Sequence, residues 1–188
     1  MTGNLLARIQ NSGQHTIEIP CLLEGPYGTL RPIHAFPTIL LVAGGVGIST
    51  ALPYLQEHLL SRTPALRFTL IWTVREVELA VNVLHRVRGL GGNSGVSIKV
   101  YITGAEPGKD EGRVFPQGVR VRYRRPRIIE QVVKAAQERE RGTAMAVVAC
   151  GSGAVVDDAR RGAVEALKTA AGRDGRGEVV YWEEAQGW

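Results

Sequence analysis

A glycine-rich segment, residues 42–49, has the composition of a phosphate-binding turn. It reads Val-Ala-Gly-Gly-Val-Gly-Ile-Ser, ends an apolar run and opens a stretch with helical spacing. Glycines let the backbone turn tightly and bring its amides close to a phosphate, and a helix N-terminus adds about half a positive charge. We therefore expect a pyrophosphate here. The alternative is a tight strand-to-helix turn that holds no ligand.

A second pattern concerns the sugar end of such a ligand. The glycines do not follow G-x-G-x-x-G, and no acidic residue ends the next apolar run to bind a ribose, which argues against an ordinary NAD dehydrogenase or a methyltransferase. That run instead ends Trp72-Thr73-Val74-Arg75. The planar guanidinium of Arg75 suits a 2′-phosphate through paired, charge-assisted hydrogen bonds. A solvated arginine that pairs with Glu76 or Glu78 is the alternative.

Five arginines surround Tyr123 and Pro126, and three interpretations of them stay open. Arginines interleaved with an aromatic ring are typical of an RNA or DNA patch. One or two of them could instead bind a 2′-phosphate, or the cluster could be a solvated strand edge where charge discourages aggregation. The arginines are Arg120, Arg122, Arg124, Arg125 and Arg127.

A cysteine ends a later apolar run, in the segment Ala149-Cys150-Gly151-Ser152-Gly153. Its small, polarizable side chain could lie in a cleft against a cofactor ring, or it could be a small buried hydrophobe. A G-x-S-x-G nucleophile elbow is excluded, because Cys150 takes the place of the first glycine. The four histidines share no i, i+4 spacing and lie on different elements, so we expect no zinc site.

Alternating strands and helices must position these segments. From Phe36 onward, apolar runs alternate with helical stretches, which favours an α/β fold with a parallel sheet covered on both faces. Ligands then belong at the carboxyl ends of the strands. Residues 103–120 are expected to form a long surface loop. The expected strands are 38–43, 67–74, 96–102, 144–149 and 178–182, and the expected helices are 50–61, 76–88, 127–141 and 153–171.

The composition sets the outer limits of the interpretation. The 188 residues suffice for one domain, or for one domain and a fragment of another. A net charge of +5 suits an anionic ligand, nucleic acid or an acidic membrane surface. Two distant cysteines indicate no disulfide framework and fit a reducing, cytosol-facing compartment. The uncharged residues 32–56 are too interrupted by proline and glycine to form a membrane span.

The start of the chain forms a separate unit in this interpretation. Residues 5–9 and 15–23 have the pattern of two short strands joined by a turn-rich spacer. Because an isolated hairpin is marginal in water, we expect them to be the end of a sheet domain whose beginning is absent from the chain.

Six motifs, taken in order, resemble one family. They are similar to the C-terminal NADPH-binding region of fungal ferric reductases and NADPH oxidases, within the ferredoxin reductase superfamily. The resemblance spans nearly the whole chain, and six motifs in order are far more specific than any one of them. The motifs are Glu24-Gly25-Pro26-Tyr27-Gly28, Ala43-Gly44-Gly45-Val46-Gly47-Ile48-Ser49, Trp72-Thr73-Val74-Arg75, Arg125-Pro126, Cys150-Gly151 and Glu183-Glu184 to Trp188.

The resemblance implies a domain division and a set of cofactor contacts. Residues 1–35 would be the C-terminal remnant of an FAD-binding barrel, and residues 36–188 would form a Rossmann-like, doubly wound NAD(P)H-binding domain. The implied cofactor-binding residues are Glu24, Gly25, Pro26, Tyr27, Gly28, Gly44, Gly45, Val46, Gly47, Ile48, Ser49, Trp72, Arg75, Arg125, Cys150, Gly151 and Trp188.

Within that set, the resemblance assigns roles by region. The glycine turn would hold the pyrophosphate, and Arg75 and Arg125 would bind the adenosine 2′-phosphate. Cys150, Glu184 and Trp188 would be the catalytic residues, with Cys150 near the nicotinamide and Trp188 stacked on the flavin ring.

The implied activity is hydride transfer from NADPH to FAD, from which electrons go singly to haem and then to ferric iron or oxygen. The flavin domain and the haem-bearing membrane domain would belong to the full-length protein, with this chain at the cytoplasmic face of the membrane. The rival interpretations are an isolated, non-catalytic nucleotide-binding fragment and a nucleic-acid-binding domain centred on residues 120–127. The resemblance implies no nucleic-acid partner.

Overall fold

A six-stranded, all-parallel sheet forms the centre of the molecule. The computed structural model describes residues 2–12, 18–22, 30–61, 65–87, 95–105, 114–171 and 177–184. Within them the strand order is β4-β3-β2-β1-β5-β6. The strands are β1 Thr38–Gly44, β2 Arg67–Val74, β3 Val96–Ile102, β4 Val119–Arg122, β5 Met145–Cys150 and β6 Val179–Glu183.

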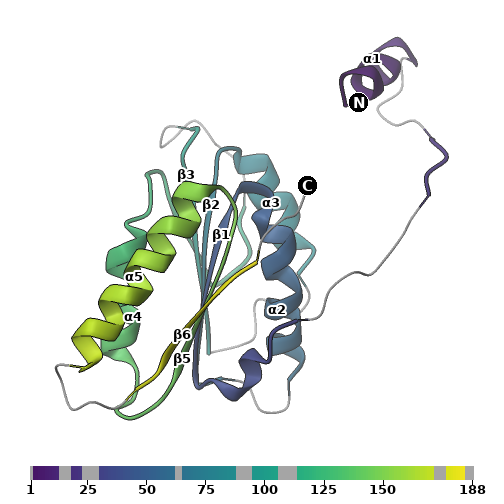
Figure 1. Cartoon of the computed structure of the whole chain (residues 1–188). Coiled ribbons are helices and arrows are strands. Elements are labelled where there is room, and N and C mark those ends of the chain that lie inside the picture. The colour runs from purple at the N-terminus through teal and green to yellow at the C-terminus, as the bar shows by residue number, and fades with distance from the viewer. Residues whose placement is uncertain are drawn as a thin grey trace.

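Helices cover both faces of this sheet. Figure 1 shows α2 and α3 on one face and α4 and α5 on the other, with α1 lying apart from this layered body. Two short 3-10 turns, η1 and η2, lie just before and just after β1. The bounds are α1 Thr2–Ser12, η1 Ile33–Ala35, η2 Gly45–Gly47, α2 Ile48–Leu60, α3 Val77–His85, α4 Ile128–Glu138 and α5 Gly153–Ala171.

The alternation of side chains along β1 shows why the expected strands are apolar throughout. Ile39 and Leu41 pack in the core beneath α2 and α3. Leu40 and Val42 pack in a second core beneath α4 and α5. Because each residue of 39–42 faces one covered side or the other, apolar side chains are favoured at all four positions. The predicted Rossmann-like, doubly wound α/β fold is confirmed.

The strand order reverses next to β1. The chain runs outward from β1 through β2, β3 and β4, and then crosses back to place β5 on the other side of β1. Connections therefore leave the carboxyl ends of β1 and β5 in opposite directions. In open parallel sheets, this reversal opens the crevice in which ligands bind.

The structure corrects the expected loop over residues 103–120. Val119–Arg122 forms β4, the edge strand, paired in parallel with β3. Val119 and Val121 pack against the core beneath α2 and α3, while the arginines between them are exposed. The segment is a strand because valine alternates with arginine at the period of two that a half-covered edge requires.

The structure also corrects the start of the chain. Residues 5–9, expected as a strand, lie in α1. Leu5, Leu6 and Ile9 recur at three- and four-residue spacing, which suits a helix, and a strand needs a neighbour to pair with. Residues 18–22 form no strand, and residues 15–17 of the second expected strand lie outside the described residues. In the described part of the chain, no helix combines the length and the apolar character that a membrane crossing needs.

Candidate functional site

Two glycine turns meet back to back at the carboxyl ends of β1 and β5. A Cβ added to Gly47 would lie 2.6 Å from the carbonyl oxygen of Cys150. A Cβ added to Gly151, whose φ is +141°, would lie 2.7 Å from the amide nitrogen of Gly44. The turns thus touch through bare backbone, and only glycine permits the approach at these two positions.

The exposed side of the first turn is open. Gly45 has a φ of +54°, and a Cβ built on it would meet no atom within 4 Å. Helix α2 begins immediately afterwards, and its N-cap, Gly47, offers no side chain to the first amides. The amide of Ile48 donates back to the carbonyls of Gly45 and Val46, and the helix N-terminus carries the partial positive charge that attracts an anion. The arrangement therefore places an open surface in front of a helix N-terminus, which suits a pyrophosphate.

Trp72 supports this turn from the protein interior. Its side chain has 0% exposure, and its indole Nε1 donates a 3.0 Å hydrogen bond to the carbonyl of Gly45. Ser49 supports the turn from the other side, because its Oγ donates to the Val46 carbonyl at 2.9 Å. The predicted binding role of Trp72 is thus indirect in this structure, since the ring is inaccessible to a ligand.

Arg75 and Arg125 both lie beyond the carboxyl ends of strands. Arg75 follows β2 directly, Arg125 comes three residues after β4, and both side chains are exposed. Because β3 alone separates β2 from β4, the two strand ends are about 10 Å apart. Neither arginine forms an ion pair with a carboxylate in the described ranges, whereas Arg127 pairs with Glu130 at 3.2 Å. The predicted pairing of Arg75 with a nearby glutamate is therefore not formed.

Cys150 and Glu184 lie beside the paired turns. Cys150 ends β5 with 2% exposure, so its side chain is a buried one. The backbone N–H of Glu184 donates to the carbonyl of Ala149 at 2.9 Å, which places Glu184 level with Cys150 on the neighbouring strand. The remaining sites expected from the resemblance, residues 24–28 and Trp188, lie outside the described residues.

A hydrogen-bonded network holds the Glu184 side chain. Tyr54, on α2, donates from its hydroxyl to Glu184 Oε1 at 2.9 Å and accepts from the backbone N–H of Arg31 at 2.9 Å. The guanidinium of Arg31 approaches the same carboxylate oxygen, with Nε 3.4 Å away. Burial, reinforced by Glu184, raises the pKa of Tyr54, so the hydroxyl keeps its proton as donor. No local sequence signal predicts this network, because its members are far apart in the chain.

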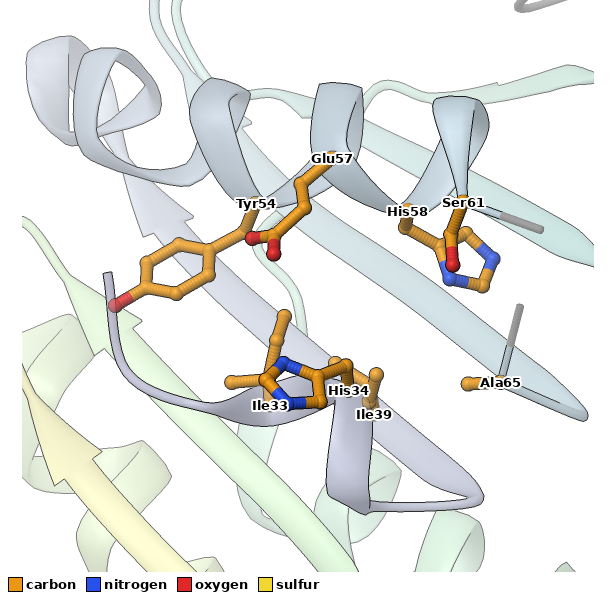
Figure 2. Close-up of a pocket in the computed structure, with 8 residues that line it drawn as sticks. All are labelled: Ile33, His34, Ile39, Tyr54, Glu57, His58, Ser61 and Ala65. Carbon is orange, nitrogen blue, oxygen red and sulfur yellow. The ribbon is translucent and has the colours of Figure 1, made fainter. Parts of the chain in front are cut away.

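A separate small pocket lies between the other end of α2 and the amino ends of β1 and β2. His58 is 5% exposed there, and its ring stacks on Phe68 at 4.3 Å between centroids. Burial lowers the pKa of His58. Figure 2 shows the Tyr54 ring pointing away from His58, toward the ribbon that leads into Ile33. The pocket is lined by Ile33, His34, Ile39, Tyr54, Glu57, His58, Ser61 and Ala65.

Known proteins with related sequences are ferric reductases. Over 108 residues the chain is 32% identical to "Ferric/cupric reductase transmembrane component 2" of Schizosaccharomyces pombe, covering 52% of the chain and 19% of that protein. It is 43% identical over 60 residues to "Ferric/cupric reductase transmembrane component 7" of Saccharomyces cerevisiae, covering 30% of the chain and 10% of the relative. An alignment to "Ferric reductase transmembrane component 5" of S. cerevisiae covers 91% of the chain at 25% identity, and 26% of that protein.

These matches differ in what they cover. The chain spans between a tenth and about a quarter of the length of these relatives. The family model described as "Ferric reductase NAD binding domain" matches residues 36–164. The matched range begins two residues before β1, ends within α5 and includes both glycine turns. The chain therefore belongs to the ferric reductase NAD-binding domain family.

Proposed function

We propose that this chain is the NADPH-binding part of a flavin-linked reductase. The observation that carries the proposal is the meeting of the two glycine turns at the strand-order reversal, with the open side of Gly45 in front of an uncapped α2. A dinucleotide laid across this crevice has its pyrophosphate at the helix terminus. The family to which the chain belongs takes a nicotinamide cofactor of that shape.

Two arginines that form no ion pair with a carboxylate of the described residues favour NADPH over NADH. Arg75 and Arg125 flank β3 at the edge where the adenosine half would lie, and no acidic residue ends β2 to bind a free ribose 2′-hydroxyl. Guanidinium groups bind phosphate through short, charge-assisted hydrogen bonds. We propose that they bind the 2′-phosphate.

The nicotinamide half extends toward β5 and β6 in this proposal. Cys150 and Glu184 lie on that side, and the backbone of Cys150 packs directly against Gly47 of the first turn. Hydride transfer needs no general acid or base, so the task of Glu184 would be to hold and orient the ring, while the buried Cys150 would support the turn behind it. NADPH supplies the hydride, and the flavin that receives it belongs to another part of a longer protein.

The further path of the electrons is proposed from the relatives. Their names describe ferric and ferric/cupric reductase transmembrane components. We therefore propose metal ions rather than oxygen as the final acceptor, reached from FAD through haem, with this chain at the cytoplasmic face of a membrane. A flavin domain, a haem and a membrane part would be required for this path.

Calorimetric titration of Arg125→Ala with NADPH and NADH tests this assignment. Loss of one charge-assisted contact at an exposed site should weaken NADPH binding by about tenfold and leave NADH binding unchanged. The matched control is Arg141→Ala. Arg141 is also exposed, but it precedes β5 and so lies at the amino ends of the strands, away from the proposed site. Equal losses for the two nucleotides in Arg125→Ala would refute a 2′-phosphate site.

A further inference from the structure

Tyr54 connects the two halves of the proposed cofactor site through one rigid helix. It lies six residues after Ile48, the first residue of α2, which places it about 9 Å along the helix from the phosphate-facing terminus. Its ring is 1% exposed, so its position is determined by the core beneath α2. The hydroxyl alone reaches out of that core, to Glu184 and to the backbone of Arg31.

Glu184 has few other restraints on its carboxylate. Its backbone is fixed by the bond to Ala149, but the side chain is 22% exposed and can rotate toward solvent. The Arg31 guanidinium is 52% exposed and reaches the carboxylate at 3.4 Å, the geometry of a weak surface ion pair. The buried hydroxyl of Tyr54, at 2.9 Å, is therefore the main restraint on the orientation of Glu184.

The segment before β1 packs against both β6 and α2 around this network. Phe36 meets Trp182 of β6 edge to face, with 5.5 Å between ring centroids, so the segment 30–36 lies along β6 beside α2. Ile33 in that segment is buried in the core beneath α2. The carboxyl end of β6 is thereby held between α2 and this segment, and Tyr54 makes the polar contact to both.

We propose that Tyr54 is a positioning residue for the nicotinamide end of the cofactor site, acting through Glu184. The proposal rests on the proposed function, since it requires that a nicotinamide nucleotide lies along the carboxyl edge. Tyr54 does not touch the cofactor. It fixes the carboxylate of Glu184 relative to the terminus of α2, so that the pyrophosphate and the nicotinamide are held at a constant separation.

The test compares two ligands in Tyr54→Phe. NADPH carries both halves of the cofactor, whereas 2′,5′-ADP carries the 2′-phosphate and the adenosine but no nicotinamide. Loss of the hydroxyl should weaken NADPH binding about three- to tenfold and leave 2′,5′-ADP binding within twofold of the parent chain. A loss of general structure would weaken both ligands alike and would overturn the proposal.

The chain offers a matched control for this substitution. Tyr181, on β6, also donates its hydroxyl to a distant group, the Val156 carbonyl at 3.2 Å, but it packs on the opposite face of the sheet. Tyr181→Phe should leave the affinities for both ligands unchanged. If it weakens NADPH as much as Tyr54→Phe does, the effect is not specific to the network and the proposal is wrong.

A double-mutant cycle establishes whether Tyr54 acts through Glu184. When Glu184→Ala is already present, adding Tyr54→Phe should cause no further loss of NADPH affinity. Full additivity of the two losses would overturn the proposal. Arg31→Gln serves as a second variant that leaves the core intact, and it should lower NADPH affinity in the same direction but by less than Tyr54→Phe.

Failure of the proposed function gives a different result from failure of the positioning role. If the parent chain binds neither NADPH nor 2′,5′-ADP, the nucleotide site itself is refuted. If it binds both and Tyr54→Phe changes neither, the nucleotide site stands and the positioning role is refuted.

Discussion

Individual residues in the two turns have different roles, although several of them are glycine. The contact between Gly47 and the Cys150 carbonyl belongs to the packing of the fold, whereas the open side of Gly45 is where the proposed ligand would lie. Glycine composition alone cannot separate these tasks. The substitution that tests binding must therefore be made at Gly45 and not at Gly47.

Gly45→Asn should weaken nucleotide binding at least tenfold while keeping the domain folded. Asparagine tolerates the φ of +54° better than other side chains do, and its added atoms would project into open space where a phosphate must approach. We expect stability within about 1 kcal/mol of the parent in urea unfolding, and at least a tenfold weaker NADPH affinity. Gly47→Ala is the contrast, because its Cβ would overlap the Cys150 backbone and cost about 1–3 kcal/mol. Parent-like binding by Gly45→Asn would show that this turn does not face the ligand.

Acidification should destabilise the domain through His58. Burial lowers the pKa of His58 below its usual value of 6.5, so the unfolded chain takes up a proton more readily than the folded one. Stability is therefore complete above about pH 6.5 and falls as the pH drops toward the lowered pKa, by at most about 1.4 kcal/mol per pH unit. Denaturant unfolding of the parent and of His58→Phe, which can still stack on Phe68, should show a stability difference that shifts in favour of the variant below this pH. A pH-independent difference would contradict the assignment.

Strand β4 ends the sheet on the side of β3, as β6 does on the side of β5. Its outer backbone edge has no neighbour in the described part of the chain, and Arg120 and Arg122 project from one face of it. Arg120 is held by a 2.9 Å hydrogen bond to Ser97 Oγ. Charged side chains on an edge strand discourage the addition of further strands. The structure is thus consistent with the strand-edge interpretation for these two arginines.

Replacing both arginines by valine should promote self-association. Arg120→Val with Arg122→Val turns β4 into a continuous apolar edge strand of high β-propensity. We expect concentration-dependent larger species in analytical ultracentrifugation, at concentrations where the parent chain sediments as a single species. The control exchanges Arg161 and Lys168 for valine on α5, where every backbone group belongs to a helix. Association of the control to the same extent would assign the effect to hydrophobicity alone.

Among the strands, those with continuous apolar runs are the ones that the sequence predicts best. β1, β2, β3, β5 and β6 agree with the expected strands to within about two residues, because continuous apolar runs of that length fit few other structures. β4 escapes the same criterion because it has four residues and only two of them are apolar. The sequence predicts part of the helix at residues 2–12 as a strand because a short apolar cluster fits both the helical period of 3.6 and the strand period of 2.

Some features of the candidate site can be predicted from the sequence and others cannot. Arg125 follows β4, which the sequence does not predict, whereas both glycine turns and Arg75 lie at the ends of recognisable strands. The contact between the two turns is not predictable, since it depends on β1 lying next to β5, which is a property of strand order. The link from Tyr54 to Glu184 spans 130 positions, and neither residue has a local pattern that points to the other.

Across the molecule, the contact between Arg31 and Glu184 has a topological consequence. Arg31 lies near the start of the described residues that precede β1, Glu184 is the last described residue, and the two are joined by an ion pair. The path between them is therefore almost a closed ring. A segment that precedes Arg31 and one that follows Glu184 would therefore start from neighbouring points, next to the carboxyl ends of the strands.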